Sequence, residues 1–134
     1  MAKHKKEIVL FSGFEEMIAK IEKAGGTADK AAEAAVKEDA EWTRQQLLDF
    51  IKKHKETGAT EASLIPVAVE NYRGKISCKV GFSISNGGLA AVFLNFGTPK
   101  IAPTFFIDKA FNNKKKHQAI QEEAMQKILN EIGG

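Results

Sequence analysis

A long stretch without glycine or proline, residues 28–55, constrains the fold more than any other feature. Alanine, glutamate, lysine and glutamine dominate it, and all four are good helix formers. At a rise of about 1.5 Å per residue, a helix of this length reaches about 40 Å. One small sheet does not cover that length, so the helix must pack on more than one element.

One face of this helix carries most of its larger apolar side chains, with Trp42 beside them. The residues on that face are Ala32, Val36, Thr43, Leu47, Phe50, Ile51 and His54. The first half of the helix, residues 31–40, is rich in alanine and has only a thin apolar stripe. We expect this half to be open to packing by a partner chain.

The segment before the long helix predicts a short helix of its own. Residues 8–11 are an apolar run, which we interpret as a strand or a docked N-terminal arm. Ser12 and Glu15 have the spacing of a capping box, and apolar residues then recur at helical spacing as far as Ala24. The glycine pair at 25–26 ends that helix, and Thr27 can cap the next one.

The middle of the chain predicts three strands. Residues 64–70 alternate, residues 71–74 form a turn, and residues 76–82 place Ile76, Cys78, Val80 and Phe82 on one face. Residues 85–88 are a hairpin signal. Residues 89–96 are apolar on both faces, which predicts a strand covered by the long helix and by another subunit.

The whole pattern predicts an α+β fold in a single domain, residues 1–134. In this fold a long helix packs on a three-stranded antiparallel β-meander. A short helix precedes the long one, and residues 119–133 form a C-terminal helix.

An extended arm, residues 97–105, follows the third predicted strand. Gly97 suits a positive φ at a sharp exit from that strand. Pro99 and Pro103 keep their predecessors extended. Phe105 and Phe106, with Phe111 shortly after, are expected to anchor the arm to the core or to a neighbouring subunit.

The arm and its flanks resemble the signature of a phage family. Residues 94–98 read Leu-Asn-Phe-Gly-Thr, and residues 106–111 read Phe-Ile-Asp-Lys-Ala-Phe. Together they are similar to the neck, or tail-completion, proteins of long-tailed bacteriophages, the HK-type phage gene-product-ten family. The matching positions are Phe96, Gly97, Thr98, Phe106 and Ala110. Asn95 and Phe105 stand where the family pattern has glutamate and proline.

The resemblance implies a structural virion protein that joins tail to head as one subunit of a homo-oligomeric ring. Its implied partners are the tail terminator or tube and the head connector, with possible non-specific contact with passing DNA. Its implied location is the virion neck, and the host cytoplasm during assembly. The implied interface residues are Phe96, Gly97, Thr98, Pro103, Phe105, Phe106, Ala110 and Phe111.

Composition and motif spacing argue against several other classes of protein. The single cysteine, Cys78, lies on the apolar face of its strand and is expected to be a buried hydrophobe. The three histidines stand at no ligand spacing, so we predict no metal, no cofactor and no enzyme. No apolar run is long enough to span a bilayer.

The net charge is +3, with basic clusters at residues 3–6 and 114–116. These clusters leave open an alternative, a small basic nucleic-acid-binding module.

Overall fold

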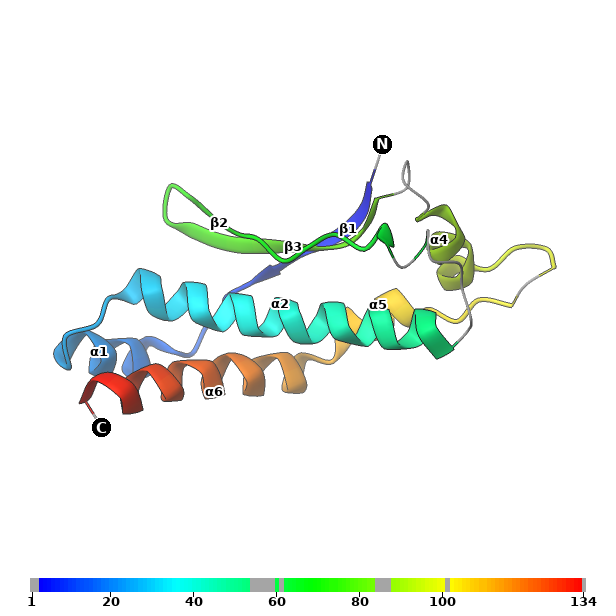
Figure 1. Ribbon diagram of the computed structural model, residues 1–134. Coiled ribbons are helices and arrows are strands. Elements are labelled where there is room, and N and C mark those ends of the chain that lie inside the picture. The colour runs from blue at the N-terminus through cyan, green and yellow to red at the C-terminus, as the bar shows by residue number, and fades with distance from the viewer. Residues whose placement is uncertain (1–2, 54–59, 61, 84–87, 101, 134) are drawn as a thin grey trace.

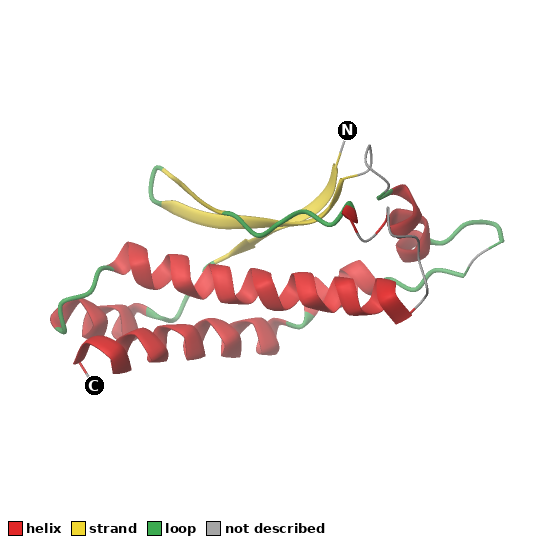
Figure 2. Ribbon diagram, viewed as in Figure 1, coloured by secondary structure: helices red, strands yellow, loops and turns green. Residues whose placement is uncertain are grey.

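The computed structural model describes residues 3–53, 60, 62–83, 88–100 and 102–133 of the chain. Its elements are β1 (Lys3–Val9), α1 (Glu15–Lys23), α2 (Ala28–Lys53), β2 (Val69–Tyr72), β3 (Lys75–Ser83), α4 (Leu89–Phe96), α5 (Phe106–Asn112) and α6 (Lys114–Gly133). The long helix α2 lies in the middle, with the sheet on one side and α1 and α6 on the other (Figure 1). The three strands thus form one layer and α1, α2 and α6 lie below it, while α4 stands at one end of the sheet (Figure 2). The α+β prediction is confirmed.

The sheet has three antiparallel strands in the order β1-β3-β2, so β3 is central. Cys78 pairs with Ile8 on one side and with Val69 on the other. The β2–β3 turn is made by Arg73 and Gly74, both at positive φ (52° and 85°), which suits a tight two-residue hairpin.

Two strand predictions need correction. Residues 89–96 form the helix α4, and the N-terminal strand β1 takes the sheet position that was expected for them. A run that is apolar at almost every position has no period to separate helix from strand. The strand predicted at residues 64–70 begins only at Val69. Upstream of it, Leu64 makes an isolated bridge to Phe82. The hairpin signal at residues 85–88 lies mostly outside the described residues.

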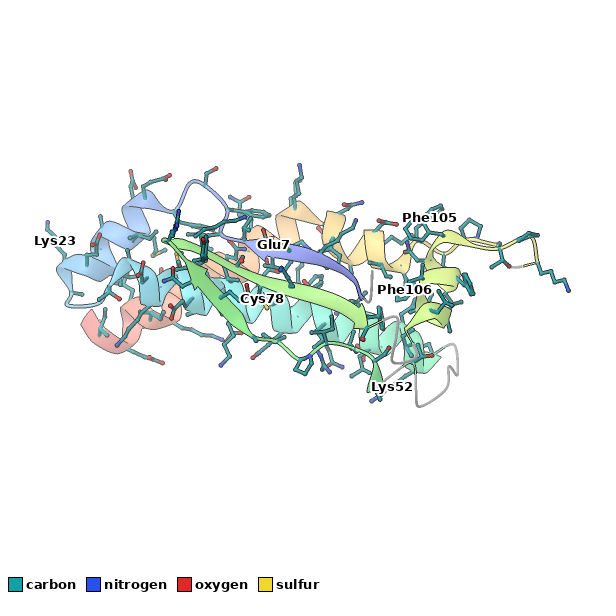
Figure 3. All side chains as sticks on the ribbon, turned by 90° about the horizontal axis from the view of Figure 1, so that it is seen from above. Glu7, Lys23, Lys52, Cys78, Phe105 and Phe106 are labelled. Carbon is teal, nitrogen blue, oxygen red and sulfur yellow. The ribbon has the colours of Figure 1, made fainter. Side chains whose placement is uncertain are left out.

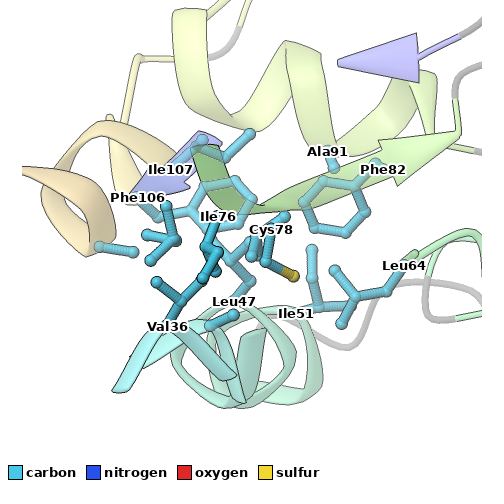
Figure 4. Packing of buried hydrophobic residues seen from close by; sticks show 14 of the residues in the cluster. Val36, Leu47, Ile51, Leu64, Ile76, Cys78, Phe82, Ala91, Phe106 and Ile107 are labelled. Carbon is cyan, nitrogen blue, oxygen red and sulfur yellow. The ribbon is translucent and has the colours of Figure 1, made fainter. Parts of the chain in front are cut away.

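The main core lies between β3 and α2. Ile76, Cys78, Val80 and Phe82 are all buried, as predicted. They pack on a row of α2 side chains that includes Leu47 (Figure 4). The α2 residues buried on this side are Ala32, Val36, Ala40, Leu47 and Ile51.

The opposite face of the sheet, seen from above in Figure 3, is covered by no helix of the described residues. Here the prediction for β3 is partly wrong. Lys79 and Ser83 are half-buried, but Ser77 is as buried as the inward residues. It lies on the central strand, between Val9 and Glu70 of the two neighbouring strands.

The alanine-rich half of α2 packs within the chain. Ala31 and Ala35 are fully buried against α1 and α6, in a second core cluster that includes Ile21 and Met125. Their small side chains let the three helices approach closely. The expectation that a partner chain covers these alanines is therefore wrong.

The helix ends agree in part with the sequence. Thr27 Oγ1 accepts a hydrogen bond from the backbone N–H of Lys30 at 3.2 Å, as predicted. The preceding helix ends before Gly25, also as predicted. It starts after Phe14, however, with no side-chain cap bond, so Ser12 is not its N-cap. Within the described residues, no helix is long and apolar enough to cross a membrane.

Candidate interaction surface

The face of α4 that points away from the core is apolar. Leu89, Phe93 and Phe96 are spaced four and three residues apart, so they share one face of the helix. Their exposed fractions are 45%, 46% and 53%. We call these three residues the α4 stripe. Exposed aromatic residues gathered on one face are typical of interaction sites.

The arm, of which residues 97–100 and 102–105 are described, leaves the end of α4 and extends beyond the body of the molecule (Figure 1). Gly97 has φ 81° and ψ 170°, so its predicted positive φ is confirmed, although it ends a helix and not a strand. The end of the arm lies against the last turn of α4, where the arm also begins. Thr104 donates from its N–H (3.0 Å) and its hydroxyl (2.8 Å) to the Leu94 carbonyl oxygen. The Phe105 N–H donates to the Asn95 carbonyl oxygen at 2.9 Å.

These bonds use carbonyl groups that the last turn of a helix leaves without partners. They close the arm at its base, so its two ends are held together. The arm is therefore a loop with a fixed root on α4.

The two phenylalanines at the end of the arm have opposite environments. Phe106 is 5% exposed and stacks on Phe50, with the ring centroids 4.3 Å apart. Phe105 is 46% exposed and lies in the left-handed region, with φ 54°. An aromatic residue is rarely found there, because its Cβ crowds the backbone. Phe106 therefore anchors the arm, and Phe105 leaves an exposed ring at the root of the arm.

A buried asparagine fixes the arm to the rest of the protein. Asn95 is fully buried; its Oδ1 accepts from the Ile107 N–H at 2.9 Å, and its Nδ2 donates to Asp108 at 3.0 Å. Asp108 in turn forms an ion pair with Lys6 on β1, at 2.9 Å. This cluster joins α4, α5 and β1, and no local spacing of residues in the sequence indicates it.

A second buried polar cluster joins α6 to α2. His117 Nδ1 contacts Asp39, and its Nε2 lies 2.7 Å from the carbonyl oxygen of Ala110. Gln121 donates to Asp39 and to the Val9 carbonyl oxygen, both at 2.9 Å. The side chains of His117, Asp39 and Gln121 are almost completely buried.

The two partners of His117 decide its charge. A carboxylate and a carbonyl oxygen are both acceptors, so this arrangement favours the imidazolium form, in which both ring nitrogens donate. Burial by itself lowers the pKa of His117. The hydrogen bond and charge of Asp39, together with the Ala110 carbonyl, outweigh burial and raise the pKa above its usual value. A pocket of about 190 Å³ opens beside this pair, lined also by Phe11 and Phe111.

The remaining sequence predictions about chemistry can be placed as follows. Cys78 is buried, and burial raises the pKa of its thiol. Lys114, Lys115 and Lys116 are exposed on the first turn of α6. Among the described residues, no group of three or more His, Cys, Asp and Glu side chains could hold a metal ion.

The residues predicted for the interface do not share one surface. Phe96, Pro103 and Phe105 are exposed around α4 and the arm, with Gly97 and Thr98 half-buried between them. Phe106 and Ala110 belong to the core, and Phe111 is half-buried with Lys6 over its ring, 5.6 Å from the centroid. Sequence reasoning missed Leu89 and Phe93 as exposed residues, because it placed them on a covered strand.

Comparisons with models of known protein families, with curated proteins and with solved structures found no match to this chain.

Proposed function

We propose that this protein is a structural subunit of a ring at the neck of a long-tailed bacteriophage, where it joins the tail to the head. The observation that carries the proposal is the α4 stripe beside the arm. The segment with the family resemblance leaves the rings of Phe96 and Phe105 exposed, and the exposed ring of Phe93 directly precedes it.

The proposed role needs shape and contact and no catalysis. A neck ring has to match the tail on one side and the head connector on the other, so no covalent bond is made or broken. The arm suits this role because its root is fixed by hydrogen bonds while its exposed residues, Pro99, Lys100, Ala102 and Pro103, extend from the body. A preorganised loop binds with a smaller entropy cost than a mobile one.

The alternative is a small basic nucleic-acid-binding module, favoured by the three exposed lysines at the start of α6. Part of the remaining positive charge is already engaged within the chain. Lys6 pairs with Asp108 and Lys75 pairs with Glu7, each at 2.9 Å. DNA binding that weakens steeply with rising salt would support the alternative.

The test of the neck function removes the gene from its phage. Filled heads and finished tails should then accumulate separately, and added protein should join them. A variant with Phe93→Ser and Phe105→Ser should fold but fail to rescue, because both side chains are about half exposed. The matched control is Tyr72→Ser, an exposed aromatic on the hairpin at the other end, which should rescue as well as wild type.

Two results would show that the neck function is wrong. One is a deletion that still yields normal infectious particles. The other is a deletion whose heads fail to package DNA, because packaging precedes the joining step.

A further inference from the structure

The α4 end of the molecule is apolar in the middle and positively charged around it. Lys53, Lys100 and Lys109 are exposed on the elements that surround the stripe. The carboxylate of Asp108, which also lies here, is already paired with Lys6. Two such ends facing each other would bring lysines together, so this surface does not complement itself.

A groove on the side of the molecule has the complementary character. It runs between α2 and α6 and has a volume of about 410 Å³. Its apolar lining includes Trp42 and Ile120, both half-buried, and the Lys116 ammonium lies over the Trp42 ring, 5.9 Å from the centroid. The charged residues of its lining are Glu38, Glu41, Glu123, Lys116 and Lys127. Three glutamates against two lysines leave the rim acidic.

We propose that the α4 stripe and the arm of one copy dock in this α2–α6 groove of a second copy. Exposed phenylalanines then meet Trp42 and Ile120, while Lys100 meets the glutamates of the rim. Tryptophan is a residue type on which binding energy often concentrates. This proposal adds to the proposed function the two surfaces by which neighbouring subunits bind each other. It rests on the proposed function only for the claim that the subunits close into a ring.

The contact joins two different surfaces, so each copy keeps one free stripe and one free groove after pairing. Such head-to-tail contacts continue to further copies and give rings or filaments. A symmetric contact would stop at a dimer. This difference makes the proposal testable with the purified protein alone.

The test mixes two variants, each with one surface removed. The stripe variant carries Phe93→Ser and Phe105→Ser. The groove variant carries Glu41→Lys and Glu123→Lys, two exposed positions. Sedimentation velocity is run up to about 1 mM, where even a contact with a millimolar Kd is half populated. Circular dichroism of each variant confirms that it is folded.

Wild type should form species larger than dimers, and each variant alone should bind itself at least tenfold more weakly. The equimolar mixture should form a one-to-one dimer and nothing larger, because only one intact stripe and one intact groove can pair. Tyr72→Ser, which lies on neither surface, should assemble like wild type.

A groove variant that assembles like wild type would show that the stripe meets another surface, and would overturn the proposal. Wild type that stays monomeric throughout the range would overturn it too. Neither result bears on the phage deletion, so failure of this contact can be told apart from failure of the neck function.

Discussion

Two neighbouring apolar segments, β3 and α4, have opposite environments. The large apolar side chains of β3 are all buried, whereas α4 leaves Leu89, Phe93 and Phe96 about half exposed. β3 lies in the middle of the sheet and over α2, so its inner face is covered along its length. α4 lies at one end of the molecule, beyond the sheet (Figure 1). What covers a segment, and not its apolar content alone, decides how much of it is buried.

The largest expected difference in stability is between truncating a phenylalanine of β3 and truncating one of α4. Phe82→Ala should lower the free energy of unfolding by about 3–5 kcal/mol, because the side chain is fully buried and leaves a cavity. Phe93→Ala on α4 should cost less than about 1 kcal/mol. Urea unfolding of the two variants measures the difference. Equal losses would mean that α4 is covered within the single chain.

The next effect sharpens the comparison at the end of α4. Gly97→Val should lower the free energy of unfolding by about 1–3 kcal/mol, because a β-branched residue is strained at φ 81°. The control, Ala90→Val within α4, should cost only about 0.5 kcal/mol, the difference in helix propensity. An unchanged urea midpoint for Gly97→Val would contradict the observed corner.

The third prediction concerns pH and the junction of α6 with α2. The pKa of His117 is raised by folding, so its contribution to stability is complete below pH of about 6.5, the unfolded value. That contribution is lost as the pH rises through the folded pKa.

Urea unfolding from pH 6 to 8 measures this loss, because the thiol of Cys78, whose pKa is raised by burial, ionises in the unfolded chain only at higher pH. His117→Gln is the control, since it should remove the slope whatever it does to the stability at one pH. Wild-type stability that stays level or rises over this range would show that His117 is not held as an imidazolium ion.

The smallest expected change in stability is that of Phe105→Asn, which is compared with truncation of the adjacent Phe106. Phe105→Asn should change the free energy of unfolding by no more than about 0.5 kcal/mol, or raise it, because asparagine tolerates the left-handed backbone better. Phe106→Ala should cost about 3–5 kcal/mol, since its buried ring stacks on Phe50. A loss above about 1 kcal/mol for Phe105→Asn would place that ring in the core.

Local pattern predicted those elements whose own residues carry a period. The alternation of residues 76–82 located β3 and its inner face, and the helix formers after Thr27 located α2. β1 was harder, because Lys-His-Lys-Lys-Glu has no apolar face and becomes a strand only by pairing with β3. α4 was missed because its apolar residues fill every face.

The buried polar clusters could not be read from spacing, since Asp39 and His117 are far apart in the sequence. One feature of the sequence does point to the cluster around Asp39. Asp39 lies among Val36, Ala40 and Thr43 on the side of α2 that is otherwise apolar. A carboxylate in such a position needs a buried partner, and His117 followed one turn later by Gln121 could have been proposed.

The Gln121 side chain has a consequence for the order in which the chain can fold. Its amide accepts from the N–H of Phe11 and donates to the carbonyl of Val9, residues that leave the ribosome long before it does. β1 likewise pairs with β3, and Lys6 with Asp108, so both contacts need residues that are synthesised later. Contacts so distant in sequence slow folding, because a long loop must close before they form. The contacts of β1 and of the residues that follow it are therefore complete only after α6, more than 100 residues later in the sequence, has been synthesised.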